Sequence, residues 1–226
     1  MIENRTTTVL QKCQLTLSHL LQSNILPDQS YLAGGTAVYF YLKHHLSVDL
    51  DFFTSSRFLP EIFLSKMKLN FDEVVIEFME QDTLILFISP EKIKFSLFHY
   101  PYPLLFPPVA MPIGEGLTCP LASLKDIAAM KAIAINQKGS LKDFIDLFYI
   151  IRETRLNFEA ISSLAIEKYG LSPHYDYHLR TSFVYFDDAE REVDQIVMLD
   201  EGGREKRPFT NEEWEKIKAF FKEFIR

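Results

Sequence analysis

Residues 33–37 read AGGTA and residues 47–53 read SVDLDFF, and these two stretches decide the fold prediction. On a β-strand, side chains two positions apart leave the same face, so Asp49 and Asp51 can point together at one site. Leu50 then points into the core. The second stretch therefore predicts a half-buried strand that presents two carboxylates to a ligand.

The glycine pair Gly34-Gly35 opens a predicted helical segment upstream of the carboxylates. A backbone without β-carbons, together with the free amide groups of a helix N-terminus, can approach phosphate oxygens closely. Two hard oxygen ligands favour Mg²⁺ or Mn²⁺, and Mg²⁺ typically takes one or two protein carboxylates plus substrate phosphates. The pattern predicts metal-dependent chemistry on a nucleoside triphosphate (NTP). The alternative is that Asp49 and Asp51 are surface carboxylates at the end of a turn.

Composition excludes several classes of protein. The 226 residues suffice for one compact domain with an appended helical region. A net charge of −7 argues against a broad DNA-binding surface, because such affinity comes mainly from phosphate neutralisation by Lys and Arg. Cys13 and Cys119 lack histidines at metal spacing, and we find neither a signal peptide nor an apolar run of about 20 residues. We expect a reduced, cytoplasmic protein without a membrane segment.

Periodicity divides the chain into a mixed first half and a helical second half. An antiparallel meander is predicted over 72–79, 83–89 and 92–100, and the proline-dense stretch 101–114 reads as an irregular crossing between the halves. Further predicted elements are a short strand at 31–33, a strand at 48–53, and helices at 6–22, 36–42, 60–69, 122–137, 140–153, 158–169, 173–190 and 210–225.

A family resemblance rests on two blocks of sequence. The first joins the glycine pair, followed by Thr36 and Ala37, to His45-x-Ser47-x-Asp49-x-Asp51. The second begins at Asp126, holds Lys131 within the apolar stretch 127–134 and continues with KDFIDL at 142–147. In this order the blocks resemble the nucleotidyltransferase family of the AbiEii/AbiGii abortive-infection toxins. Their combination is far more specific than an isolated Asp-x-Asp.

The resemblance implies an α+β (α/β) fold, with a nucleotidyltransferase-like mixed β-sheet flanked by helices and followed by a C-terminal helical region. Residues 1–115 would form the α/β core, and 116–226 the helical region that completes the active-site cleft. It implies catalytic roles for Asp49, Asp51, Lys131 and Asp146, with Asp49 and Asp51 as metal ligands. Nucleotide binding is implied for Gly34, Gly35, Thr36, Ser47 and Lys131.

Each residue of the second block also has a structural interpretation. Lys131 lies in an apolar stretch, where an ammonium group must reach an anion or extend to water, so it is either a phosphate clamp or a lysine that extends to the surface. Asp146 is either a site carboxylate or an ordinary acid on a helix surface, where Lys142 could pair with it at i+4.

Two departures from the family pattern are visible. The strand expected to supply a third carboxylate reads KFSLF at 94–98, with Ser96 at the acid position. Either another acid completes the metal site or catalysis is weakened. Where the family often has arginine, His44 and His45 stand before Ser47. Histidines can titrate or coordinate metal, but exposed loop histidines are the commoner outcome, and we assign them no role.

The resulting hypothesis is a nucleotidyltransferase that transfers NMP from an NTP to an RNA such as tRNA, a protein or a small-molecule acceptor, with Mg²⁺ or Mn²⁺ as cofactor. It would be the toxin of a toxin–antitoxin or phage-defence system, neutralised by a cognate antitoxin. The alternative is a degenerate member that binds nucleotide or a protein partner without turnover. A nucleotide-sugar glycosyltransferase using Asp-x-Asp ranks last, because it leaves the glycine pair unexplained.

Overall fold

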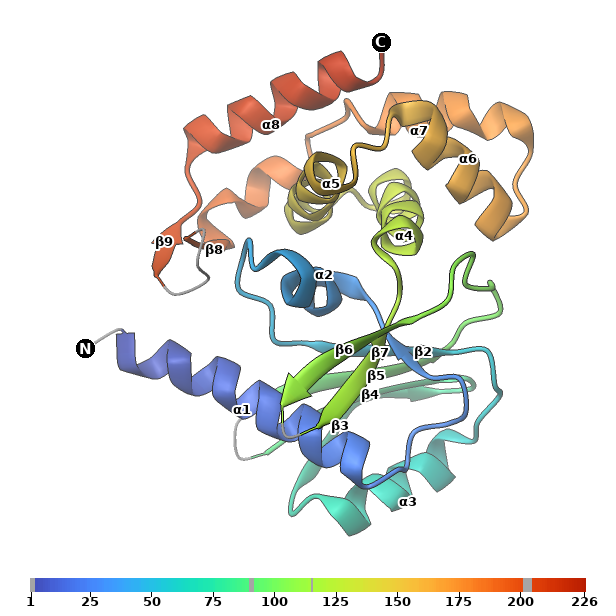
Figure 1. The fold of residues 1–226 in the computed structure, drawn as a ribbon, viewed down its shortest axis with the longest axis vertical. Helices are drawn as coiled ribbons and strands as arrows, with labels where there is room; N and C mark the ends of the chain where they lie inside the picture. The colour runs from blue at the N-terminus through green and yellow to red at the C-terminus, as the bar shows by residue number, and fades with distance from the viewer. Residues whose placement is uncertain (1–2, 90–91, 115, 201–204) are drawn as a thin grey trace. The chain divides into compact units, whose positions relative to one another are not determined.

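The computed structural model describes residues 3–89, 92–114, 116–200 and 205–226, and the chain forms two compact units (Figure 1). Unit 1 comprises residues 1–36, 47–103 and 108–122, and unit 2 comprises residues 37–46, 104–107 and 123–226. The division predicted at residue 115 stays a prediction.

Unit 1 is built on a seven-stranded sheet in the order β3-β4-β5-β2-β1-β7-β6. Strand β1 runs antiparallel to β2 and parallel to β7, while β2 runs parallel to β5, so the sheet is mixed. The predicted antiparallel meander is confirmed in β3, β4 and β5. The strands are β1 Tyr31–Leu32, β2 Leu50–Thr54, β3 Val74–Glu80, β4 Thr83–Ile88, β5 Ile93–His99, β6 Val109–Gly114 and β7 Leu117–Leu121.

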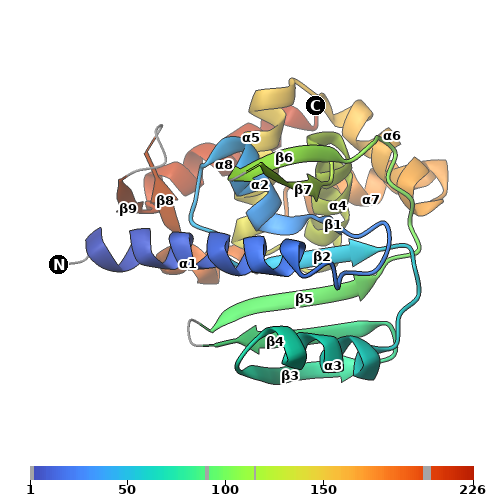
Figure 2. The ribbon, with the colours of Figure 1, turned by 60° about the horizontal axis from the view of Figure 1, so that its bottom comes forward.

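Two helices of unit 1 pack against this sheet. Helix α1 (Glu3–Gln22) contacts β6 and β7, and helix α3 (Pro60–Asn70) contacts β3 and β4, as Figure 2 shows from below. Proline at the start of α3 fits a first turn that needs no amide donor, and Phe63 and Met67 from its inner face are buried. Asp51 of β2 and Ser96 of β5 lie opposite each other in register, between the buried neighbours Leu50 and Phe52 on β2.

The hairpin β6–β7 corrects a prediction. The stretch 101–114 was expected to be irregular because it is rich in proline, but residues 109–114 form a strand. This strand is the edge of the sheet, and Pro112 lies on it. Proline is tolerated on edge strands because no inner ladder bond depends on its missing N–H group. Proline at this position therefore indicates an edge strand and not an irregular segment.

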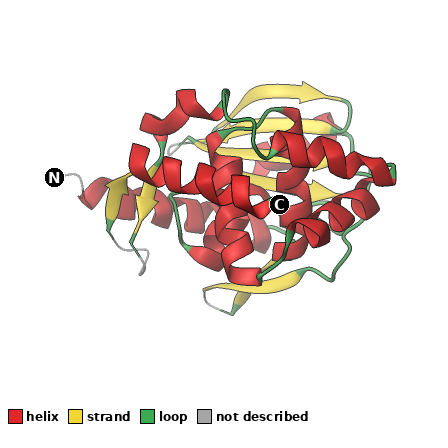
Figure 3. Ribbon diagram, turned by 90° about the horizontal axis from the view of Figure 1, so that it is seen from above, coloured by secondary structure: helices red, strands yellow, loops and turns green. Residues whose placement is uncertain are grey.

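Unit 2 consists mainly of helices, drawn red in Figure 3. Helix α4 packs against α5 and α6, and Phe144 of α5 contacts the rings of Phe186, Trp214 and Phe221 in the core. The helices are α4 Leu124–Gln137, α5 Leu141–Thr154, α6 Phe158–Tyr169, α7 Asp176–Ser182 and α8 Asn211–Phe224; α2 (Gly34–Leu42) begins in unit 1 and continues into unit 2. No helix in the described part of the chain is long and apolar enough to span a bilayer.

Two predictions for unit 2 are wrong. The helix expected over 173–190 is α7 flanked by 3-10 turns at Pro173–Tyr175 and Ala189–Gln195. No strand was expected between the helices predicted over 173–190 and 210–225, yet β8 (Val197–Leu199) and β9 (Lys206–Pro208) form a hairpin. Leu46 N donates to Val197 O at 2.9 Å, so distant backbone pairing supports β8. Such pairing leaves no local periodicity.

A buried ion pair ties unit 2 together away from the predicted site residues. Asp126 and Lys168 are both fully buried, and Lys168 Nζ lies 3.0 Å from Asp126 Oδ1. The backbone amides of Leu105 and Phe106 donate to the same carboxylate at 2.8 and 3.1 Å. Because its hydrogen bonds are satisfied, this pair anchors the 104–107 segment to α4 and α6.

Candidate functional site

The two carboxylates predicted as metal ligands lie at strand β2, with Asp51 on the strand and Asp49 directly before it. Leu50 and Phe52 are fully buried, whereas Asp51 between them is only partly buried. Asp49 directly precedes the strand and is also partly buried. The predicted alternation is present at Leu50, Asp51 and Phe52, whereas the strand begins at Leu50 and not at residue 48, so the shared face of Asp49 and Asp51 stays a prediction.

Gly34 touches Asp51 across the turn between β1 and α2. A β-carbon built on Gly34 would lie 3.0 Å from Asp51 Oδ2, and Gly34 has φ +72°, a conformation that favours glycine. Ala33 N also donates to Asp51 O at 3.0 Å. The structure therefore brings Gly34 and Asp51 together, seventeen residues apart in sequence, and glycine is needed at the contact.

Thr36 and Ser47 join the same place in unit 1. Their hydroxyl oxygens lie 2.9 Å apart and share a hydrogen bond. Helix α2 begins at Gly34, so Gly35 and Thr36 belong to its first turn, where amide groups have no intrahelical acceptor. Hydroxyls and free amides beside paired carboxylates suit a metal-bound polyphosphate.

Cys13 supports this segment from α1. Its thiol donates to Val48 O at 3.3 Å. Burial raises the pKa of Cys13 to about 12, and the nearby negative charge of Asp49 adds to this effect. The thiol therefore stays protonated and acts as a structural donor rather than as a nucleophile.

Ser96 lies directly opposite Asp51 on the neighbouring parallel strand β5. It is 1 % exposed, so the third position of the carboxylate row holds a small buried hydroxyl. Lys94, two residues earlier, forms an ion pair with Glu77 at 2.8 Å. The hydrogen bond to Glu77 is the main cause that raises the pKa of Lys94, and the charges of Asp49 and Asp51 contribute as well. This cation near the carboxylates was not among the predicted site residues.

In unit 2, Lys131 of α4 meets two acids of α5. Its Nζ lies 2.8 Å from Asp143 Oδ1 and 2.7 Å from Asp146 Oδ2. Lys131 is 8 % exposed and Asp146 is fully buried. The interpretation of Asp146 as a surface acid paired with Lys142 is therefore wrong, as is that of Lys131 as a lysine that extends to water.

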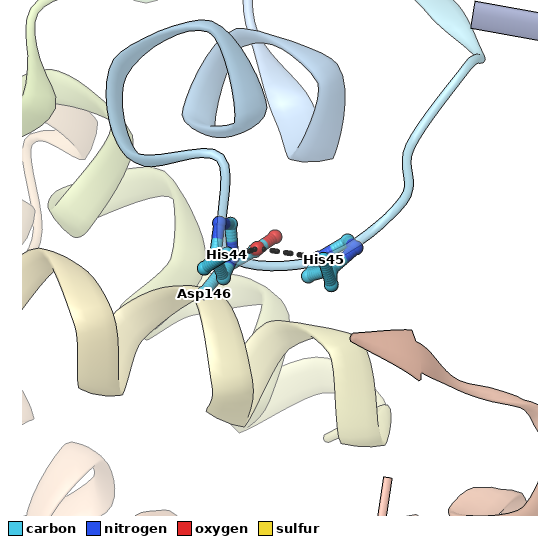
Figure 4. Close-up of side chains that lie close together, drawn as sticks. All are labelled: His44, His45 and Asp146. Carbon is cyan, nitrogen blue, oxygen red and sulfur yellow. Dashed lines mark hydrogen bonds and ion pairs between the residues drawn. The ribbon is translucent and has the colours of Figure 1, made fainter. Parts of the chain in front are cut away.

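The two histidines converge on the same carboxylate (Figure 4). His44 Nε2 and His45 Nε2 lie 2.7 and 2.9 Å from Asp146 Oδ1. Their exposed fractions are 4 % and 1 %, so the expectation of exposed loop histidines is wrong. No local sequence pattern indicates this pairing, because more than a hundred residues separate the two histidines from Asp146.

The surroundings fix the charge of each group. Burial alone would raise the pKa of Asp146, but Lys131, His45 and the histidine hydrogen bonds outweigh it and hold that pKa well below its usual value. Burial alone would lower the pKa of Lys131, but Asp146 and Asp143 raise it above its usual range. Burial is the largest effect on His44 and lowers its pKa despite the bond to Asp146. Asp146 is thus held ionised.

Two oxygen atoms fix the orientation of the His45 ring. Its Nδ1 lies 3.1 Å from Leu46 O and its Nε2 lies 2.9 Å from Asp146 Oδ1. Both ring nitrogens therefore lie within hydrogen-bond distance of an oxygen.

Ligand atoms of His44, His45 and Asp146 lie within 4.8 Å of one another, a spacing that a metal ion could use. Two observations favour hydrogen bonding instead. The nitrogen–oxygen distances of 2.7 and 2.9 Å are those of direct N–H···O contacts. The other oxygen of Asp146 is already neutralised by Lys131. The cluster is therefore a carboxylate held by three nitrogen donors.

Comparison with known proteins gives concordant results. A family model described as nucleotidyl transferase AbiEii toxin, type IV TA system, matches residues 16–225. An uncharacterized protein of Aquifex aeolicus strain VF5 is 35 % identical over 198 residues, which cover 87 % of this chain and 86 % of that protein.

Two solved structures share the fold. MenT4, a nucleotidyltransferase toxin of Mycobacterium tuberculosis H37Rv, matches with a TM-score of 0.62 and 17 % identity over 94 % of this chain and 82 % of its own. A candidate nucleotidyltransferase of H. pylori matches with a TM-score of 0.52 and 12 % identity, over 95 % of this chain and 94 % of its own. The predicted fold class is thereby confirmed.

Proposed function

From the premise that this chain belongs to the AbiEii nucleotidyl transferase toxin family, we propose that it transfers NMP from an NTP to a hydroxyl group of an acceptor. In this reaction the acceptor oxygen bonds to the α-phosphorus, the bond from the α-phosphorus to the bridging oxygen breaks, and pyrophosphate leaves. The hydroxyl proton passes to solvent.

The close approach of Gly34 to Asp51 carries the proposal. It places a carboxylate directly against the first residue of α2, where any larger side chain would meet Asp51 Oδ2. Gly34, Gly35, Thr36 and Ser47 would contact the triphosphate through amide and hydroxyl donors. These groups bind and orient the NTP.

The carboxylates Asp49 and Asp51 fit Mg²⁺ or Mn²⁺, because two hard oxygen ligands at and just before the start of β2 suit a cation that also binds phosphate oxygens. When bound, such an ion would stabilise negative charge on the phosphoryl oxygens. Ser96 supplies no third carboxylate, so these two acids would hold the ion without one from β5.

On the family resemblance, Lys131 and Asp146 are proposed as further catalytic residues. Lys131 would clamp phosphate, for which its ammonium must exchange one of its present carboxylate partners. Asp146 would act as an ionised carboxylate kept in place by His44 and His45. The histidines are positioning residues in this scheme.

We further propose a cytoplasmic toxin that uses an RNA such as tRNA, a protein or a small molecule as acceptor and is neutralised by a cognate antitoxin. Family membership supports the toxin role and an NTP substrate.

A second candidate function is nucleotide or partner binding without turnover. The observation that favours it is Ser96, a hydroxyl opposite Asp51 where a third acid was expected. Full transfer activity of the unmodified chain would eliminate it.

The test is transfer of label from each α-labelled NTP into total RNA and total protein, with Mg²⁺ and with Mn²⁺. We expect labelled product with the native chain and none with Asp49→Ala/Asp51→Ala. Equal labelling by both proteins, each shown to be folded, would contradict the proposal.

A further inference from the structure

A groove of about 730 Å³ lies within unit 2, and none of the predicted site residues lines it. It is bordered by the end of α2, the C-terminal turn of α5 and the β8–β9 hairpin. Its cations are Lys43, Arg152, Arg155 and Arg207, and its acids are Glu153 and Asp200. A chain of net charge −7 thus gathers a local excess of positive charge.

Most of these cations have no ion-pair partner among the described residues. Among the described residues, Lys43, Arg152 and Arg155 form no ion pair, whereas Arg207 is bound by Glu213 through both guanidinium nitrogens. The guanidinium of Arg152 lies over the Phe148 ring, 5.5 Å from its centroid. Stacking on a ring leaves the planar N–H edge of arginine available to an anion.

Two cations occupy backbone positions that favour glycine. Lys43 has φ 50° after the end of α2, and Arg155 caps α5 with φ 59°. Helices commonly end on glycine or asparagine in this conformation, and a side chain with a β-carbon is strained there. Favourable interaction with a helix C-terminus offsets part of this cost. Both cations nevertheless line the same groove, which the helix ends alone do not require.

The lining also holds an orphaned buried atom. His44 lines the groove while its Nε2 bonds to Asp146, and its Nδ1 is buried without a hydrogen-bond partner. The Tyr149 ring lies 4.9 Å from the His44 ring. An aromatic side chain and a polar atom without a partner beside several cations are features of a ligand pocket.

We propose that this groove binds a phosphate-bearing anion. Arginine forks match phosphate oxygens in paired hydrogen bonds, and the volume is that of a small-molecule or single-strand subsite. The phosphates of a polynucleotide strand and of a free polyphosphate share this chemistry. The proposal concerns unit 2 residues alone and does not depend on NTP binding by unit 1.

The test measures binding of a fluorescent single-stranded RNA dodecamer by anisotropy, without divalent metal, with inorganic tripolyphosphate as competitor. The variant is Arg152→Gln/Arg155→Gln. Its matched control is Lys138→Gln/Lys142→Gln, which removes the same charge from two exposed lysines outside the groove. Melting curves establish that all proteins are folded, and Asp49→Ala/Asp51→Ala is measured in parallel.

We expect the groove variant to weaken RNA binding about tenfold or more and to lower the slope of log K against log salt by about 1.4, whereas the control changes affinity less than about twofold. If Asp49→Ala/Asp51→Ala retains RNA binding, the groove and the NTP site are distinct sites. RNA binding resistant to tripolyphosphate assigns the groove to polynucleotides, and competition assigns it to polyphosphates generally. Equal losses in groove and control variants, or no binding of either probe, would overturn the proposal.

Discussion

A β-carbon at Gly34 would lie 3.0 Å from Asp51 Oδ2, so the first residue of α2 and the proposed metal ligand of β2 are in direct contact. Gly34→Ala would add this collision to a positive φ, with an expected stability loss of about 1–2 kcal/mol. We expect Mg-NTP affinity, measured by calorimetry, to fall as Asp51 is displaced.

The matched control for Gly34→Ala is Gly170→Ala. Gly170 has φ +61°, but a β-carbon there meets nothing within 4 Å. It should lose comparable stability and keep full Mg-NTP affinity. Equal affinities of the two variants would show that the contact with Asp51 does not shape the site.

Ser96→Asp tests the position opposite Asp51. A carboxylate buried there beside Asp51 is costly without a counter-ion, so the melting temperature should fall in chelator. Mg²⁺ or Mn²⁺ should restore it by binding the enlarged acidic set. Ser96→Asn, similar in size and uncharged, should show no such metal dependence, and an identical metal response of the two variants would refute the assignment.

Comparison of Lys131→Met with Lys168→Met distinguishes a role of Lys131 in nucleotidyl transfer from a role in stability alone. Each leaves a buried carboxylate without its ammonium partner, which costs about 3–5 kcal/mol in such pairs. Urea denaturation should show both losses. Only Lys131→Met should abolish nucleotidyl transfer per folded molecule, because Lys168 serves the structural pair with Asp126. Equal loss of transfer activity in both variants would mean that Lys131 has only a structural role.

The lowered pKa of His44 predicts a pH dependence of stability. As pH falls below about 6.5, the unfolded chain takes up a proton at this residue before the folded chain does. The free energy of unfolding should therefore fall, by at most about 1.4 kcal/mol per pH unit for one proton. His44→Gln should flatten this slope between about pH 7 and 5 in urea titrations. An unchanged slope would contradict the account of His44.

The position of Asp51 was predictable from local sequence. Alternation along β2 placed it between the buried Leu50 and Phe52, and the glycine pair indicated a close backbone approach that Gly34 makes. The burial of Asp146 was not predictable, because it depends on His44 and His45 from a different part of the chain. Helical spacing relates Asp146 only to neighbours on α5.

The fold shows the same limit. The meander β3–β4–β5 was predicted, since short polar turns separate strands rich in β-branched residues. Proline hid β6, an edge strand, and β8 depends on pairing with residues 45 and 46. Elements that non-local contacts stabilise leave little periodic signal.

The most direct test of the central claim is calorimetry of Mg-NTP binding to the native chain and to Asp49→Ala/Asp51→Ala, with melting curves to show that both are folded. The account predicts metal-dependent binding by the native chain that the double variant loses. Unchanged affinity in the variant, or no binding by either protein, would contradict the assignment of these carboxylates to an NTP site.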